Sequence, residues 1–66
     1  MKVIINGTAH ELATGTGVGD AVRLVTTSAS GIAVAVNGEV TRRASWDTTP
    51  LADGDEIEVI TATQGG

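Results

Sequence analysis

The sequence predicts an α+β domain in which one helix lies across one face of a mixed sheet of four to five strands. Two Asn-Gly dipeptides, Asn6-Gly7 and Asn37-Gly38, each interrupt a run of β-branched and apolar residues, which is the strongest short-range signal for a hairpin. Between them, apolar residues recur with helical spacing, and an alternating run comes near the end of the chain. The expected element order is therefore ββαβββ.

The 66 residues suffice for one domain. We expect residues 1–66 to form that domain, with residues 63–66 as a flexible C-terminal tail. The chain has no cysteine, which excludes disulfides, thiolate metal sites and cysteine nucleophiles. With one Trp and no Phe or Tyr, the core must be built from small aliphatic side chains.

The net charge of -4 indicates what kind of partner the protein meets. A chain with eight acidic and four basic residues repels phosphate backbones, so we expect no nucleic acid partner and favour a basic protein surface. The opening "MKVIINGTAHEL" lacks the apolar segment of a signal peptide, and no run approaches the length that crosses a bilayer. We expect a cytoplasmic protein without membrane contact.

The predicted helix is weak by composition. Its apolar face comes from residues at i, i+3, i+4 and i+7, namely Val18, Ala21, Val22 and Val25. Thr16 is the expected N-cap, and Asp20 suits the positive end of the helix. Gly19 and the β-branched residues are poor helix formers, so the helix needs tertiary contacts.

The strands on either side follow from alternation and turn residues. Strands are expected over Lys2–Ile5, 8–12, Ile32–Val36, 39–41 and 56–63, and the segment "RRASWDTTP" between the last two reads as an irregular crossover. Glu56 and Glu58 mark the solvent side of the last strand. Ile60 shares that side, as Ile4 does in the first strand next to Lys2.

If the first and last strands are neighbours, Ile4 and Ile60 form one exposed apolar spot rimmed by Lys2, Glu56 and Glu58. Such a spot is a candidate partner-docking patch. The alternative is two isolated surface aliphatics, which are common on any protein.

Motifs that resemble catalytic or binding sites are better explained by structure. "GTGVG" before the helix suggests a phosphate loop, but it lacks both the GxGxxG spacing and a following Gly-Lys-Ser/Thr, so we interpret it as a loop. His10 is the only histidine and has no companion ligands at metal-binding spacing. We therefore expect no metal.

Three further groups have two readings each. The carboxylates of Asp53, Asp55, Glu56 and Glu58 are read as turn and solvated-strand residues in preference to an acid–base pair. Arg42 and Arg43 are read as soluble surface in preference to an anion site. Trp46 is expected to close one end of the core in preference to recognising a ligand. No nucleophile, base and oxyanion donor can be assembled, so we expect no catalytic residue.

The last residues, "TQGG", then remain as the candidate site. They are either a frayed terminus or a tail whose reactive group is the α-carboxylate of Gly66. A carboxylate on Gly-Gly has no Cβ to clash, so it can enter a narrow channel. Four extended residues would reach about 13 Å beyond the sheet.

The residues that carry a family resemblance are "AVAVNGEVTRRASWDTTPLADGDEIEVITATQGG", Ala33–Gly66, together with the opening "MKVIINGTAHEL". This sequence closely resembles the ThiS family, the sulfur carriers of thiamine thiazole biosynthesis. The middle, "TGTGVGDAVRLVTTSAS", is less leucine-rich than the helix usual in the family. The resemblance implies a ubiquitin-like β-grasp fold and a protein cosubstrate instead of an enzyme.

It also implies a set of partners. An E1-like adenylyltransferase of the ThiF type would use ATP and Mg²⁺ to convert the Gly66 carboxylate to an acyl-adenylate, and this chain would itself bind no cofactor. A cysteine desulfurase would supply the sulfur of a Gly66 thiocarboxylate, and thiazole synthase of the ThiG type would accept it. Gly65 and Gln64 would lie in the partner's active-site channel, with Ile4 and Ile60 at the docking patch.

Three other functions remain open from the sequence. The small subunit of molybdopterin synthase uses the same tail chemistry, although those chains are commonly longer and have a more aromatic last strand. A ubiquitin-like protein modifier would join Gly66 to lysines. A non-covalent binding module would not need the tail.

Overall fold

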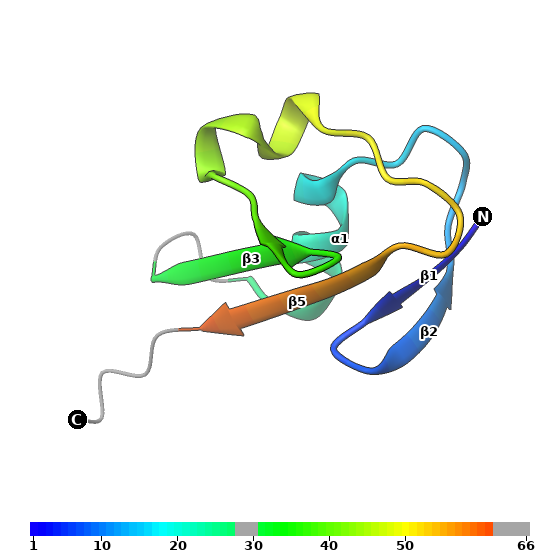
Figure 1. Ribbon diagram of the computed structural model, residues 1–66, viewed down its shortest axis with the longest axis horizontal. Coiled ribbons are helices and arrows are strands. Elements are labelled where there is room, and N and C mark those ends of the chain that lie inside the picture. Colours follow the sequence, from blue (N-terminus) through cyan, green and yellow to red (C-terminus); the bar gives the residue numbers. More distant parts are fainter. Residues whose placement is uncertain (28–30, 62–66) are drawn as a thin grey trace.

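A computed structural model describes residues 1–27 and 31–61 of the chain (Figure 1). In chain order, the elements in these residues are β1 (Lys2–Ile5), β2 (Thr8–Glu11), α1 (Val18–Val25), β3 (Ile32–Val36), β4 (Glu39–Val40), the 3₁₀ helix η1 (Arg43–Thr48) and β5 (Glu56–Thr61). The predicted order ββαβββ is confirmed. The crossover expected to be irregular contains η1.

The strands form one five-stranded sheet in the order β2-β1-β5-β3-β4. The last strand, β5, is therefore central, and it runs parallel to β1 and antiparallel to β3. Helix α1 covers one face of this mixed sheet (Figure 1). The arrangement is a ubiquitin-like β-grasp fold, as the sequence resemblance implied.

Both Asn-Gly turns form the predicted hairpins. Asn6 and Asn37 have φ of 50° and 52°, and the glycines that follow have φ of 82° and 83°. Two consecutive positive φ angles are characteristic of the type I′ turn, whose twist matches that of the flanking strands. The two turns thus have nearly the same backbone.

The core lies between α1 and the inner face of the sheet. In β1 and β5 the faces follow the predicted alternation as far as Ile60, because side chains in a strand point to opposite faces with period two. The fully buried side chains that fill this core are Val3, Ile5, Val18, Val34 and Ile57. Trp46 from η1 is also buried, and its indole Nε1 donates to the Thr41 carbonyl at 3.0 Å. The prediction that it closes one end of the core is confirmed.

The start of α1 differs from the prediction. Gly17, not Thr16, is the N-cap residue, and the Thr16 hydroxyl donates to the Ala13 carbonyl at 2.7 Å. The Asp20 carboxylate instead accepts from the Gly17 N–H at 3.1 Å. A carboxylate in the first turn supplies both an acceptor and a favourable charge, so a hydroxyl cap is not needed.

The end of the helix also differs from the prediction, whereas the predicted end of the last strand is not tested. Val25, expected on the buried face of α1, is 39% exposed, because the helix ends at this residue. The last strand was predicted to run to Thr63, but β5 is described as far as Thr61. Residues 62 and 63 lie outside the described residues.

Candidate functional site

The candidate site is the segment that follows β5. Gln64, Gly65 and Gly66, the residues predicted to react or to enter a partner's channel, lie outside the described residues. The described part of the site is therefore the strand that leads to them. How that strand is held decides how firmly the base of the tail is attached to the domain.

The exposed and buried faces of β5 are as predicted as far as Ile60, whereas Thr61, expected to point inward with Ile57 and Val59, is exposed at the end of the strand. Ile57 and Val59 are buried under α1, whereas Glu56, Glu58 and Ile60 are exposed. On one side, β5 pairs with β3 along most of its length, from Ile57 opposite Val36 to Thr61 opposite Ile32. On the other side its pairing with β1 covers only Glu56 and Ile57. The second half of β5 thus lacks a strand ladder on its β1 side.

The Asn6 side chain supplies the missing contact on that side. Its Oδ1 accepts from the Val59 N–H at 2.8 Å, and its Nδ2 donates to the Val59 carbonyl at 3.2 Å. An asparagine amide carries both an acceptor and donors, so it can satisfy the two backbone groups of one residue. Asn6 therefore acts as a short extension of β1 along β5.

Asn37 holds the start of β5 from the other side. Its backbone N–H donates to the Glu56 carbonyl at 2.7 Å, and its Oδ1 accepts from the Glu56 N–H at 3.0 Å. Its Nδ2 donates to the Asp55 carboxylate, also at 3.0 Å. Sequence reasoning assigned both asparagines to turns and missed these contacts. The available signal was that asparagine, which can donate and accept, occupies the same turn position twice.

The predicted joint spot of Ile4 and Ile60 is not formed. The strands are neighbours as expected, but the register sets Ile4 opposite Glu56, four residues before Ile60. That offset corresponds to about 13 Å along the strand, with the exposed Glu58 between the two positions. Alternation predicts a face but cannot predict a register between strands far apart in sequence.

Ile60 has other apolar neighbours on the same face. It lies opposite Ala33 of β3, and Ala35 of β3 lies opposite Val40 of the edge strand β4. Ile60 is 57% exposed and Val40 is 74% exposed. The exposed apolar side chains of this face thus lie over β3, β4 and the end of β5. We call these four residues the distal patch.

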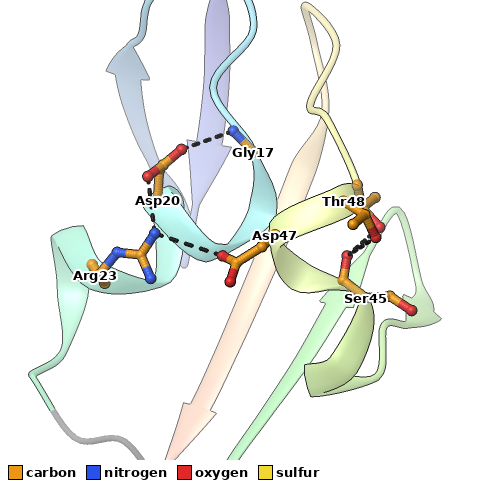
Figure 2. Close-up of polar contacts among 7 residues, drawn as sticks. Gly17, Asp20, Arg23, Ser45, Asp47 and Thr48 are labelled. Atoms are coloured by element: carbon orange, nitrogen blue, oxygen red, sulfur yellow. Dashed lines mark hydrogen bonds and ion pairs between the residues drawn. The ribbon is translucent and has the colours of Figure 1, made fainter.

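The glycines of "GTGVG" have structural roles, as Figure 2 shows for the helix start. The N–H of Gly17 donates to Asp20, so a carboxylate of the chain itself occupies the place a phosphate would take. A Cβ at Gly19 would lie 2.5 Å from the Asp47 Oδ1 of η1, so the Asp47 carboxylate would have to move. The Asp47 side chain is exposed, so it can shift, and glycine at position 19 permits its present position next to Arg23.

Arg23 forms ion pairs with one residue of α1 and one residue of η1. Its guanidinium lies 3.0 Å from Asp20 and 3.7 Å from Asp47 (Figure 2). The Gly17 N–H, and then the Arg23 guanidinium, hold the pKa of Asp20 below its usual range. All three charged side chains are exposed, so their pairs give orientation more than stability.

The acidic residues before β5 serve the turn, as predicted. The Asp53 carboxylate accepts from the Lys2 N–H at 2.8 Å, and the Asp55 carboxylate accepts from the Ala52 N–H at 2.7 Å. Gly54 has a φ of 89°, which glycine adopts without strain. These carboxylates are engaged by the backbone and form no pair suited to acid–base chemistry.

Two searches of the described residues gave negative findings. Across residues 1–27 and 31–61, no group of three or more His, Asp or Glu side chains could hold a metal ion. No helix in the same part of the chain has the length and hydropathy needed to cross a bilayer.

Comparison with known proteins finds solved structures with the same fold, among them two thiamine biosynthesis proteins. The crystal structure of the thiamine biosynthesis protein ThiS from Geobacter metallireducens matches with a TM-score of 0.81 and 30% sequence identity, covering 100% of both chains. A solution NMR structure of a thiamine biosynthesis protein from that organism has a TM-score of 0.78 and 28% identity over 100% of this chain and 88% of that one. No curated protein matches significantly. The model of the ThiS family matches residues 3–66, and the chain therefore belongs to the ThiS family.

Proposed function

We propose that the protein is a sulfur carrier of thiamine biosynthesis whose Gly66 carboxylate is converted to a thiocarboxylate. The observation that carries the proposal is the family match, which extends through residue 66 and so includes the Gly-Gly. The fold supports it, because the residues before the tail belong to the central strand of the sheet. A firmly held strand gives the tail a fixed origin while the reactive end enters another protein.

The chemistry requires activation of the carboxylate, since a free carboxylate resists attack by a nucleophile. In the proposed first step an adenylyltransferase partner, with ATP and Mg²⁺, joins the Gly66 carboxylate to AMP and releases pyrophosphate. A persulfide supplied by a cysteine desulfurase then displaces AMP. Cleavage of the sulfur–sulfur bond by a thiol leaves the thiocarboxylate, whose sulfur passes to thiazole synthase.

We propose that the distal patch, Ala33, Ala35, Val40 and Ile60, is the centre of the docking surface for these partners. It is apolar, it includes the end of β5, and three of its residues are exposed while Ala35 is half-buried. A typical interface covers about 800 Å² on each protein, an area wide enough to include Ile4 as well. The adjoining Glu56 and Glu58 favour a basic rim on the partner.

Intact mass spectrometry of the protein from its native cells tests the chemistry. Replacement of one oxygen by sulfur at Gly66 is expected, and fragmentation should place the change on that residue. The same spectrum reports whether Gly66 is the terminal residue in cells, which the chemistry requires. A protein that carries no sulfur under conditions of active thiamine synthesis would contradict the proposal.

One variant and two assays separate this proposal from the alternatives. Addition of one residue after Gly66 should abolish sulfur transfer and leave the fold unchanged, whereas a non-covalent binding module would keep its function. Reconstitution with thiazole synthase and, separately, with the large subunit of molybdopterin synthase identifies the acceptor. Lysine-linked conjugates in cell extracts would instead indicate a protein modifier.

A further inference from the structure

A groove of about 490 Å³ lies between α1 and η1. Its lining includes Val22 and Arg23 of α1 and Arg43, Trp46 and Asp47 of η1. None of these residues belongs to the distal patch or to the tail. The groove is therefore separate from the surfaces used in the proposed sulfur transfer.

The charged side chains at the groove differ in their contacts. Arg23 is paired with Asp20 and Asp47. The Arg43 side chain, by contrast, makes no ion pair or side-chain hydrogen bond with any residue in 1–27 or 31–61. The two arginines and two aspartates sum to zero, so Arg43 is distinguished by its unpaired guanidinium and not by an excess of positive charge. A guanidinium binds a carboxylate through two parallel hydrogen bonds, so the groove favours one carboxylate.

The apolar wall of the groove comes from Trp46 and Val22. The Trp46 indole is fixed by its hydrogen bond to the Thr41 carbonyl, and both side chains belong to the buried core. Trp and Arg are among the residue types that most often contribute strongly to binding at protein interfaces, and Trp46 offers the groove the 9% of its surface that is exposed. Trp46 is the one aromatic residue of the chain.

We propose that this groove binds a segment of a partner protein in which a carboxylate side chain lies next to an apolar one. The carboxylate would pair with Arg43, and the apolar side chain would lie against Trp46. A phosphate group fits less well, because Asp47 borders the same groove and repels a multiply charged anion. The proposal does not rest on the chemistry of Gly66.

Selection of a phage-displayed library of random heptapeptides on the immobilised full-length protein tests this inference. The enriched peptides are expected to contain Asp or Glu beside Leu, Ile, Met or an aromatic residue. The affinity of synthetic copies is measured by the fluorescence of Trp46, the single Trp of the chain. Replacement of the acidic residue by its amide should weaken binding at least about tenfold, since a charge-assisted hydrogen bond is lost.

The chain offers a matched control in the adjacent arginine. Arg42 is exposed and does not line the groove. Arg42→Glu and Arg43→Glu change the charge of the protein by the same amount. Binding should weaken at least about tenfold in Arg43→Glu and Arg43→Gln, and less than about twofold in Arg42→Glu, which changes only the long-range charge. Unfolding curves confirm that all three variants are folded.

Several results would overturn the proposal. These are the absence of enriched peptides, enrichment of peptides without acidic residues, and equal loss of affinity in Arg42→Glu and Arg43→Glu. Displacement of the peptides by inorganic phosphate or ATP at lower concentration than by acetate would assign the groove to phosphate anions instead.

Discussion

The two Asn-Gly turns have the same sequence and nearly the same φ angles, yet they hold β5 in different ways. Asn6 makes both side-chain bonds to the backbone of Val59, and these bonds are partly buried. Asn37 divides its bonds between the Glu56 backbone and the Asp55 carboxylate, and they are exposed to solvent. The local sequence sets the turn, and the surroundings of the turn set what its side chain contributes.

The largest effect is expected from Asn6→Gly. Glycine keeps the positive φ without strain, so the variant removes only the side-chain bonds. The Val59 N–H and carbonyl would lose their partners in a partly buried position, which should lower the free energy of unfolding by about 2 kcal/mol. Urea unfolding followed by Trp46 fluorescence measures the change. If Asn6→Gly lowers the free energy of unfolding no more than Asn37→Gly does, then water fully replaces the hydrogen bonds of the Asn6 side chain.

The second-largest loss of unfolding free energy is expected when alanine replaces the glycine of either turn, and the loss should be equal in both turns. A Cβ at Gly7 or Gly38 would meet no atom within 4 Å, so alanine there adds only the strain of a positive φ. Gly7→Ala and Gly38→Ala should each cost about 1 kcal/mol. Equal unfolding free energies would show that the turn backbones are energetically equivalent. A difference above about 0.5 kcal/mol, beyond the usual scatter of independent sites, would contradict this.

A smaller effect is expected from Asn37→Gly. Its bonds to Glu56 and Asp55 are exposed, so water can take the place of the amide, and the cost should be about 0.5 kcal/mol. The double variant with Asn6→Gly should show the sum of the single effects, because the contacts lie three residues apart on opposite sides of β5. If Asn37→Gly lowers the free energy of unfolding more than Asn6→Gly does, then the turn at Asn37 is the more important of the two, contrary to this prediction.

The smallest effect is expected for Asp20, which binds the Gly17 N–H in full solvent. Its pKa is lowered in the folded protein, first by that N–H and then by Arg23. The stabilisation is therefore complete above the unfolded pKa of about 4 and is lost as the pH falls through the lower folded value. The melting temperature of Asp20→Asn should lie below that of the original protein at pH 7 and approach it near pH 2. A constant difference across this range would exclude the ionic contribution.

Glycines show how far sequence reasoning could go. The hairpin turns at Gly7 and Gly38 were predicted from the Asn-Gly dipeptides, and both glycines have the positive φ that such turns need. Gly19 was read only as a poor helix former. In the structure it lies beside the Asp47 carboxylate of η1, a residue 28 positions later in the chain. No local pattern reports such a contact.

The candidate site shows the same limit. Family membership and the tail were accessible from the sequence, because "PLADGDEIEVI" and the Gly-Gly are read directly. The prediction that Ile4 and Ile60 form one patch was wrong. It assumed a register in which these two residues lie side by side, whereas the parallel pairing of β1 and β5 places Ile4 opposite Glu56.

By itself the sequence determined the two hairpins, the faces of the first and last strands and the approximate span of the helix. Each of these depends on neighbouring residues through backbone angles or periodicity. The tertiary structure alone decided that Asn6 holds Val59, that Gly19 faces Asp47 and that Ile60 adjoins Ala33. Each of these contacts joins residues more than 25 positions apart, where only the packing of the whole chain fixes the register and the distance.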